Sequence, residues 1–308
     1  MLNKKLSVDS LIEAAELTYQ DVMTIFEQTD YYIKEYKPGL KFDELKGVSV
    51  AMAFFEPSTR TKLSFELAAK RLSADILSFQ SSTSSLTKGE SLIDTLHTIE
   101  AMDVQMYVVR HSKSGSPKFL KDNTKGVILN AGDGKHAHPT QALLDAYTLR
   151  KHFGKVENLR ICICGDILHS RVARSNIALL KTLGAEVRLC GPGTLLPRFP
   201  NIWDCQYCDN IDEAIIWADV LLVLRLQRER MENGILPSIR EFNKYYGVSY
   251  QQFKSKKNLV IMHPGPVNYG VELDYNISYD KNCLIETQVT HGVYIRMALL
   301  ALLGQRFK

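Results

Sequence analysis

The chain has 308 residues, of which 45% are hydrophobic and 23% are charged. This ordinary globular balance excludes disorder, collagen or a coiled coil as a description of the whole chain. The 38 Lys and Arg residues against 34 Asp and Glu residues give a net charge of +4. A dedicated nucleic-acid binder carries a far more concentrated basic excess, so the charge argues against that class and leaves small anionic partners open. At about 150 residues per domain, the length predicts two domains.

The start of the chain, residues 1–36, has an amphipathic helical pattern without the basic head, apolar run and cleavage site of a secretory signal. No apolar run approaches the roughly 18 residues that a membrane span needs. The six cysteines are too irregularly spaced for a disulfide scaffold, so we expect a reducing cytoplasm. Cys205 and Cys208 form one CxxC pair, but a zinc site needs a second matching pair. We therefore expect no metal site, and only core or incidental surface roles for the cysteines.

Short β-rich runs alternate with longer helical stretches, which favours parallel sheets covered by helices on both faces. We expect strands, in chain order, at residues 48–55, 105–109, 127–130, 160–164, 186–190, 220–224 and 259–262. We expect helices at residues 59–72, 92–102, 140–152, 172–183, 212–217 and 289–303. The fold class is thus α/β, with two doubly wound domains at residues 1–138 and 150–288. The last helix, within 289–308, should pack back on the first domain.

Three segments lack a regular pattern. Residues 80–90 are polar, with Leu86 as the only apolar member, so they cannot order by burying their own side chains. This segment is either a solvated connector or a mobile loop that orders against something else. Residues 191–210 hold three prolines without periodicity, and residues 227–253 are long and polar. Both are expected to be irregular.

The strand that ends at Phe55 runs through a hydroxyl-rich turn, residues 57–62, into a helical pattern. A helix N-terminus there presents backbone N–H groups, side-chain donors and the positive end of a helix dipole to an anion. The turn lacks the glycines and the terminal Lys-Ser/Thr of a P-loop. Ser58 or Thr59 as a simple helix cap is the alternative. Arg60 inside the turn favours an anion site, a phosphate cradle in outline.

Polar residues also follow other expected strands, and in open α/β sheets ligands bind beyond the carboxyl ends of strands. Taken singly, these residues are weak signals. From its position alone, a histidine such as His138 before a proline at a helix start is more often a cap or core-edge residue than a catalytic one. The alternative for His263, before Pro264, is that it satisfies a buried carbonyl. The strand-end segments are Arg110-His111, residues 130–134 leading to 138–141, Gly165-Asp166 before Arg171, and residues 263–266.

Five motifs together resemble, in order and spacing, the aspartate/ornithine carbamoyltransferase family. Residues 225–230 look like the aspartate-binding signature of the aspartate carbamoyltransferase catalytic chains in that family, whereas ornithine-using relatives differ there. The resemblance covers essentially the whole chain. The motifs are FEPSTRT at residues 55–61 with SFE at 64–66, KGE at 88–90, HPTQ at 138–141, RLQRER at 225–230 and HPGP at 263–266.

The resemblance implies a site for carbamoyl phosphate, whose phosphate would be held by charge-assisted bonds and backbone N–H groups. It further implies that three donors face the carbamoyl oxygen, which becomes negative when an amine attacks. The carbamoyl NH2 would be held by Gln141 and by the carbonyls of Pro264 and Gly265. The phosphate ligands would be Ser58, Thr59, Arg60, Thr61 and Arg110, and the donors to the oxygen Thr61, Arg110 and His138.

By the same resemblance, Arg171 would bind the α-carboxylate of aspartate, and Arg225, assisted by Gln227, its side-chain carboxylate. Lys88 and Ser84, in the polar segment, would enter the active site of a neighbouring subunit in a homotrimer. Ser85 is an equally suitable donor on chemistry alone. No metal or organic cofactor is implied, because phosphate is itself a leaving group and a proton acceptor.

The resemblance therefore implies carbamoyl transfer to L-aspartate, a step towards pyrimidines, with carbamoyl phosphate bound mainly by residues 1–138 and aspartate mainly by 150–288. Another amine acceptor, or a non-catalytic phosphate-binding protein on the same fold, is the alternative. Family trimers stand alone or join regulatory or dihydroorotase chains, and the sequence leaves this open. Tyr269 stands where many related chains have arginine, so a fixed positive charge is missing there.

Overall fold

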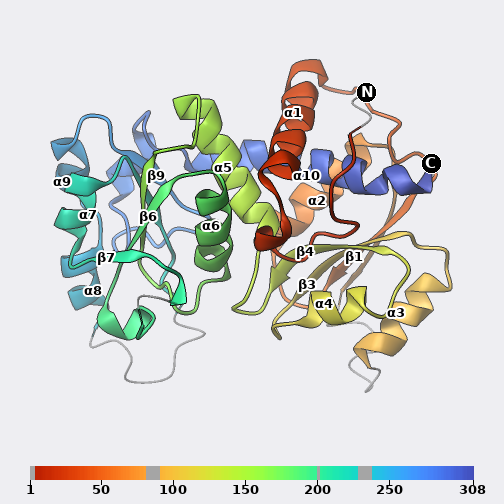
Figure 1. The fold of residues 1–308 in the computed structure, drawn as a ribbon, viewed down its shortest axis with the longest axis horizontal. Helices are drawn as coiled ribbons and strands as arrows, with labels where there is room; N and C mark the ends of the chain where they lie inside the picture. The colour runs from red at the N-terminus through yellow and green to blue at the C-terminus, as the bar shows by residue number, and fades with distance from the viewer. Residues whose placement is uncertain (1–3, 81–90, 200–201, 228–237) are drawn as a thin grey trace. The chain divides into compact units, whose positions relative to one another are not determined.

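The computed structural model describes residues 4–80, 91–199, 202–227 and 238–308. The chain divides into two compact units (Figure 1). The first unit comprises Met1–Leu144 and Thr290–Lys308, and the second comprises Asp145–Val289. The division falls inside two helices, α5 (Pro139–Phe153) and α10 (Ile285–Gly304), each of which starts in one unit and ends in the other.

The first unit contains a four-stranded parallel sheet in the order β2-β1-β3-β4. β1 is buried at five of its six positions, and β3 and β4 are almost wholly buried. Such continuous apolar runs are typical of parallel strands covered on both faces. Figure 1 shows α3 and α4 on one side of this sheet and α1, α2 and α10 on the other. The elements are α1 (Tyr19–Glu35), β1 (Ser49–Phe54), α2 (Thr59–Arg71), β2 (Asp75–Gln80), α3 (Leu92–Glu100), β3 (Met106–His111), α4 (Ser116–Lys121) and β4 (Val127–Asp133).

The chain start closes the β4 edge of this sheet. The backbone N–H of Leu11 donates to Ile128 O at 2.9 Å, and the N–H of Asn130 donates to Leu11 O at 2.9 Å. Leu11 pairs in parallel with Leu129. A sheet edge left open would expose unpaired backbone groups, so this contact both satisfies the edge and fixes the chain start beside β4.

The second unit contains a five-stranded parallel sheet in the order β7-β6-β5-β8-β9. Its main core lies between one sheet face and the helices α7 and α9, which contribute Ile211, Ile215 and Phe253. The elements are β5 (Arg160–Cys164), α6 (Arg171–Thr182), β6 (Glu186–Cys190), β7 (Gln206–Cys208), α7 (Ile211–Trp217), β8 (Val220–Val223), α8 (Ile239–Tyr246), α9 (Tyr250–Ser255) and β9 (Val260–Met262).

The end of α10 packs on the first unit, as the sequence predicts. Gly304 lies against Leu45 so closely that an added Cβ would clash with that side chain. Earlier in the helix, Arg296 Nη1 donates to Ser64 Oγ at 2.7 Å, and its guanidinium lies 5.0 Å from the Phe65 ring centre. The two-sheet, doubly wound α/β prediction is confirmed.

All seven expected strands and all six expected helices are present, with bounds shifted by a few residues. Five helices and strands were not expected, and one of them is α4, which has only six residues. The prediction of irregular structure over 227–253 is wrong where it meets α8 and α9, which begin at the capping residues Ser238 and Ser249. β2 and β7 are two further strands, and β7 lies inside the segment 191–210. β7 has only three residues, too few to give a periodic signal. The segment 81–90 lies outside the described residues.

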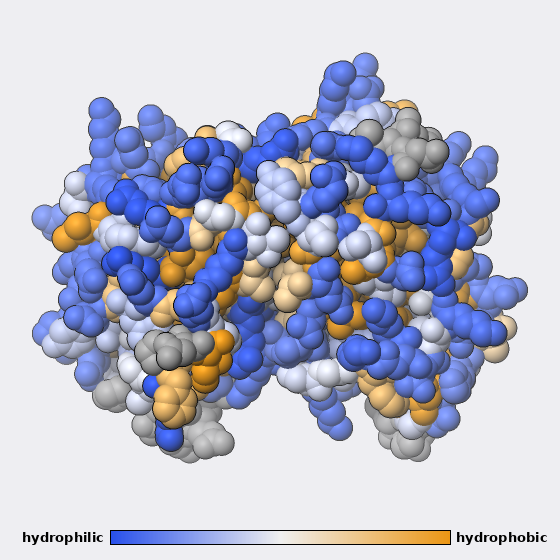
Figure 2. All heavy atoms as spheres, in the orientation of Figure 1, coloured by the Kyte–Doolittle hydropathy of each residue, from blue (hydrophilic) through white to orange (hydrophobic). Residues whose placement is uncertain are grey.

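Within the described ranges, no helix is long and apolar enough to cross a membrane. On the face that Figure 2 shows, hydrophilic residues cover most of the surface, and hydrophobic residues appear in small areas between them. Scattered apolar residues of this kind are normal on a protein surface and need no binding partner.

Replacing Asp219 with asparagine should destabilise the protein at neutral pH. Arg160 Nη2 lies 2.7 Å from Asp219 Oδ1, and Arg160 Nε and its backbone N–H both reach Oδ2. Burial opposes ionisation, but the hydrogen bonds and charge of Arg160 hold the pKa of Asp219 below its ordinary value. We expect a loss of about 1–2 kcal/mol at pH 7, measured by urea unfolding.

The stability loss caused by Asp219→Asn should depend on pH. Because the folded state lowers the pKa of Asp219, the stabilisation is present above the ordinary value near 4 and is lost as the pH falls through the folded pKa. The difference between the two proteins should therefore shrink in acid. Asp122→Asn, which breaks an exposed pair with Lys118, is the control and should cost no more than about 0.5 kcal/mol. Equal losses from both substitutions would contradict the prediction.

Candidate functional site

The first unit has a topological switch point between β1 and β3. From β1 the chain builds β2 on one side, and then β3 and β4 on the other. Neighbouring strands whose connections leave in opposite directions open a crevice at their carboxyl ends, which is where ligands bind in open α/β sheets. Phe54, at the end of β1, is the register partner of Arg110. The expected phosphate ligands thus follow the two strands that flank this switch point.

Ser58 is the N-cap residue of α2, but its side chain makes no capping hydrogen bond. The interpretation of Ser58 as a helix cap is therefore not supported. No acidic residue lies in the first turn of α2, so no carboxylate of that turn offsets the positive end of the helix dipole. Thr59 and Arg60 are exposed at this end, and Thr61 is buried. This arrangement suits a small anion such as a phosphate.

Arg110 is held by two oxygen acceptors. Its Nη1 donates to Ala131 O at 3.1 Å, and its Nη2 donates to Glu56 Oε1 at 3.2 Å. The carbonyl of Arg110 accepts the N–H of Phe55 at 2.8 Å, which ties β3 to the start of the turn after β1. Arg110 is 9% exposed. A buried guanidinium fixed in this way is preorganised to donate without a large loss of side-chain entropy.

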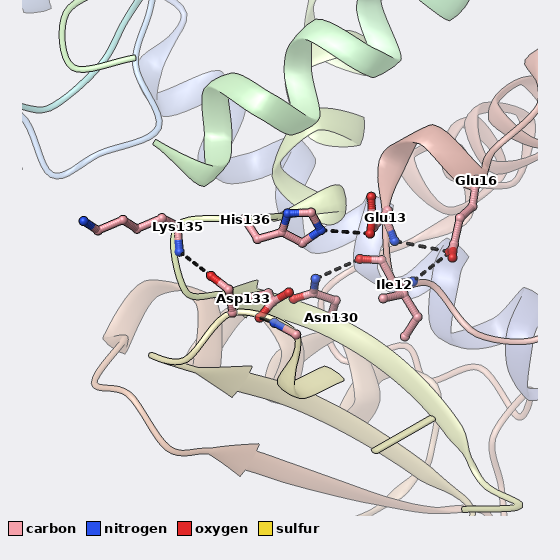
Figure 3. A network of polar contacts seen from close by, with 9 residues as sticks. Ile12, Glu13, Glu16, Asn130, Asp133, Lys135 and His136 are labelled. Carbon is pink, nitrogen blue, oxygen red and sulfur yellow. Dashed lines mark hydrogen bonds and ion pairs between the residues drawn. The ribbon is translucent and has the colours of Figure 1, made fainter. Parts of the chain in front are cut away.

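The connection from β4 to α5 is held by the chain start (Figure 3). Asn130 Nδ2 donates to Ile12 O at 2.8 Å, and His136 Nε2 lies 2.8 Å from Glu13 Oε1. The N–H of Asp133 donates to Ala137 O at 2.9 Å, which folds the connection back on itself. His138 follows directly. The network therefore positions the segment that leads into His138.

His138 and Gln141 lie at the start of α5, both almost fully buried. The N–H of Gln141 donates to His138 O at 3.0 Å, so the two residues share the first turn of the helix. The structure thus brings His138 and Gln141 of the HPTQ motif to the same end of the helix. Gln141 belongs to the first unit, together with the turn after β1 and with Arg110.

The second unit has its own switch point, between β5 and β8. From β5 the chain builds β6 and β7 on one side, and then β8 and β9 on the other. Gly165 follows β5 with φ +117°, and an added Cβ would lie 2.9 Å from Leu224 O, just after β8. Only glycine fits such a backbone. Arg171 follows β5 and Arg225 follows β8, so both expected aspartate ligands flank this second switch point.

Arg171 is the first residue of α6 and is 5% exposed. The turn before it is fixed by Asp166, whose Oδ1 accepts from the N–H of His169 at 3.2 Å and lies 2.9 Å from His169 Nδ1. Ser170 caps the helix by accepting the N–H of Ala173. These contacts hold the position of Arg171.

Arg225 and Gln227 are half-buried and flank Leu226. Leu226 is 2% exposed and packs with Leu195 and Phe242 in a small hydrophobic cluster. This anchor holds the segment after β8.

The HPGP segment after β9 is organised by His263. Its Nδ1 accepts the N–H of Gly265 at 2.8 Å, and its Nε2 lies 3.4 Å from Glu272 Oε1. The Nδ1 atom of His263 is thus bonded to a backbone amide. Pro264 and Gly265 are half-buried. Tyr269, at the position of the missing arginine, is exposed and packs edge-on against Tyr275, with ring centres 5.0 Å apart.

Two of the predicted site residues, Ser84 and Lys88, lie outside the described residues, as does Ser85. Sequence reasoning did not assign three residues that position the others: Glu56 beside Arg110, Asp166 beside His169, and Glu272 beside His263. Glu56 lies inside the FEPSTRT motif, and Asp166 lies in the Gly165-Asp166 segment that precedes Arg171. A cationic residue close to each of them in the sequence is the signal that could have identified them. Glu272 gave no such signal.

The comparisons with known proteins agree with this geometry. Residues 9–151 match the family model "Aspartate/ornithine carbamoyltransferase, carbamoyl-P binding domain", and residues 157–303 match "Aspartate/ornithine carbamoyltransferase, Asp/Orn binding domain". The chain is 47% identical over 308 residues to the aspartate carbamoyltransferase catalytic subunit of Flavobacterium psychrophilum, with 99% of this chain and 100% of that protein covered.

Solved structures of aspartate transcarbamoylase from Trypanosoma cruzi are also similar. The complex with carbamoyl phosphate and aspartate has a TM-score of 0.85 at 27% identity, covering 95% of each chain. The complex with carbamoyl aspartate and phosphate has a TM-score of 0.84 at 28% identity, covering 95% of this chain and 94% of that one. On the matches to both domain models, this chain belongs to the aspartate/ornithine carbamoyltransferase family.

Proposed function

We infer that this protein transfers the carbamoyl group of carbamoyl phosphate to the amine of L-aspartate, giving N-carbamoyl-L-aspartate and phosphate. The observation that carries this inference is the pair of switch points. One is flanked by the anion-binding end of α2 and Arg110, and the other by Arg171 and Arg225. The similar proteins from Flavobacterium psychrophilum and Trypanosoma cruzi carry the corresponding names and ligands.

For the first substrate, Ser58, Thr59, Arg60 and Thr61 bind the phosphate together with Arg110. The missing capping hydrogen bond at Ser58 and the lack of an acidic residue in the first turn of α2 support this role. Carbamoyl phosphate is therefore bound mainly by residues 1–138, which lie in the first unit. Aspartate is bound mainly by residues 150–288.

For the chemical step, Thr61, Arg110 and His138 donate to the carbamoyl oxygen. When the aspartate amine attacks the carbonyl carbon, this oxygen gains negative charge, so fixed donors stabilise the transition state more than the ground state. The two contacts that fix Arg110 support its part in this set. Gln141 and the carbonyls of Pro264 and Gly265 orient the carbamoyl NH2. Phosphate leaves and can accept the amine proton.

For the acceptor, Arg171 binds the α-carboxylate, and Arg225 with Gln227 binds the side-chain carboxylate. A guanidinium meets a carboxylate through two parallel hydrogen bonds. An acceptor with a cationic side chain, such as ornithine, would be repelled by Arg225. We also propose a cytoplasmic homotrimer in which Lys88 and Ser84 complete the active site of a neighbouring subunit.

The test is an assay of the purified protein with carbamoyl phosphate and either L-aspartate or L-ornithine. We expect phosphate release and carbamoyl-aspartate formation with aspartate, and none above background with ornithine. Phosphate release without a carbamoylated amino acid would indicate simple hydrolysis. Equal turnover of ornithine, or no turnover of either acceptor, would contradict the proposed function.

A further inference from the structure

Four cysteine thiols converge in the core of the second unit. Cys162 and Cys164 lie on β5, Cys190 on β6 and Cys208 on β7, and all belong to one hydrophobic cluster on one face of the sheet. We call these four residues the thiol cluster. Each is at most 1% exposed. The proposed carbamoyl transfer uses none of them.

The strand register brings these thiols together. Cys164 pairs with Cys190, and Cys190 pairs with Cys208, in adjacent parallel strands. Register partners in a parallel sheet point to the same face, and Cys162 shares that face because it lies two residues before Cys164. Cys164 Sγ is 3.6 Å from Cys162 Sγ. Adjacent strands lie about 4.8 Å apart, inside the range of Cα separations that disulfides span.

A metal site is the first alternative for four thiols. Among the residues that the structure describes, however, no group of three or more His, Cys, Asp or Glu side chains is arranged to hold a metal ion. The cluster also holds no second CxxC pair. Thiol–disulfide chemistry is the remaining reaction that joins neighbouring sulfurs.

We propose that the thiol cluster is an oxidation site, in which hydrogen peroxide converts Cys190 to a sulfenic acid and Cys164 then closes a reversible disulfide between β6 and β5. In the first step the Cys190 thiolate attacks a peroxide oxygen, an S–O bond forms, the O–O bond breaks, and hydroxide leaves and is protonated to water. In the second step the Cys164 sulfur attacks Cys190, an S–S bond forms, and the hydroxyl leaves as water with the proton of Cys164. Two thiols and one peroxide thus give one disulfide and two waters.

The surroundings distinguish the two partners. Contacts with the thiols of Cys162 and Cys164 lower the pKa of Cys190. The contact with Cys162 also acts to lower the pKa of Cys164, but the contact with Cys190 and burial outweigh it and raise that pKa. The thiolate is the nucleophile in sulfur oxidation. Cys190 is therefore the sulfur that reacts first, and its register partner Cys164 is the thiol that resolves the sulfenic acid.

Access to Cys190 comes from the sheet edge. β7 has three residues and is the last strand in the described sheet order, next to β6. Local opening of part of a protein can cost far less free energy than global unfolding, and we expect this short strand at the sheet edge to open in that way. Opening of β7 removes Cys208 from beside Cys190 and lets a molecule of the size of water or peroxide reach that sulfur. Reactivity should therefore be slower than that of an exposed thiol.

The disulfide is coupled to the expected aspartate ligand Arg171. The N–H of Gly165 donates to Cys190 O at 2.8 Å, and a Cβ added to Gly191 would lie 2.5 Å from Gly165 O. Because the two strand ends are closely packed at Gly165 and Gly191, we expect the approach of the two sulfurs to shift the segment from Gly165 to Arg171. This part of the inference rests on the proposed function: oxidation should raise the KM for aspartate several-fold and leave that for carbamoyl phosphate unchanged.

The test is peptide mapping of the full protein. Reduced protein is treated with hydrogen peroxide, the remaining thiols are blocked with N-ethylmaleimide, and trypsin is added. Cleavage after Arg160, Arg171, Arg188, Arg198 and Arg225 places β5, β6 and β7 on separate peptides. Peptide 161–171 carries Cys162 and Cys164, 189–198 carries Cys190, and 199–225 carries Cys205 and Cys208. We expect a link between 161–171 and 189–198, with fragment ions that assign it to Cys164, and its loss after dithiothreitol.

Variants sharpen this test. Cys164→Ala and Cys190→Ala should each abolish the link, whereas Cys283→Ala, outside the cluster, should keep it. Circular dichroism checks that each variant folds, and mapping of the unchanged protein does not depend on them. A link to 199–225, oxidation of Cys283 without any link, or a stoichiometric metal bound by the thiols would overturn the proposal. A correct link with an unchanged aspartate KM would overturn the coupling to Arg171, while an inactive protein that still forms the link would count against the proposed function alone.

Discussion

Replacing Arg225 with alanine should raise the KM for aspartate by about 10- to 100-fold and leave the KM for carbamoyl phosphate nearly unchanged. A charge-assisted hydrogen bond to a carboxylate contributes about 1.5–3 kcal/mol, and 1.4 kcal/mol is a factor of ten. Arg225 follows β8 at the switch point of the second unit, whereas the proposed phosphate ligands belong to the first. The loss should therefore fall on one substrate only.

Two further variants test the chemistry of this position. Arg225→Lys keeps the positive charge but loses the planar fork, so its aspartate KM should lie between those of the original protein and Arg225→Ala. Arg188→Ala removes a cation of the same unit that stacks on Trp217, and it should leave both KM values unchanged. A similar rise in the KM for carbamoyl phosphate, or a similar effect of Arg188→Ala, would contradict the assignment of Arg225.

The switch points explain why much of the fold and the site can be predicted from sequence. β1, β3, β5 and β8 are apolar runs that end at polar residues, and a parallel sheet brings such ends to one edge. Motifs that follow separate strands therefore meet in space without any long-range signal in the sequence. Arg110 beside the turn after β1 is an example, because the register of β1 and β3 alone brings them together.

The unpredicted parts depend on register or on tertiary packing. The convergence of Cys164, Cys190 and Cys208 follows from the alignment of three strands, and spacing along the chain does not encode that alignment. α8 is short and mostly polar, and it exists because Phe242 packs with Leu195 and Leu226. Local propensity alone does not stabilise a helix of this length in water.

Glu272 shows the same limitation at a single residue. It is fully buried, receives the N–H of Asn268 and lies beside His263. Buried carboxylates are rare unless they are paired, so the sequence favours an exposed Glu272. Glu272 is buried because the chain folds back after Tyr269 and places it beside the HPGP segment. The local sequence pattern does not indicate this fold-back.

Mixing two inactive variants should restore activity if the active site is shared between subunits. Arg60→Ala removes a cation from the exposed first turn of α2, and Lys88→Ala removes one from the polar segment at residues 80–90. We propose that Lys88 serves a neighbouring subunit and Arg60 serves its own. Each variant alone should then form nearly inactive trimers, because every site lacks one of the two cations.

In mixed trimers some sites regain both cations. A site is intact when its own chain carries Arg60 and its neighbour carries Lys88, and each condition is met with a probability of one half under random equal mixing. Recovery should therefore approach about a quarter of the original rate, by the symmetry of a cyclic trimer. Subunit exchange is checked by native mass spectrometry with one isotope-labelled variant. As a control, Lys88→Ala is mixed with Lys113→Ala, in which the α2 turn is intact. This control mixture gives the rate that a chain with an intact α2 turn contributes. If labelled and unlabelled subunits exchange and the Arg60→Ala and Lys88→Ala mixture stays inactive, Lys88 acts within its own chain or has no part in catalysis.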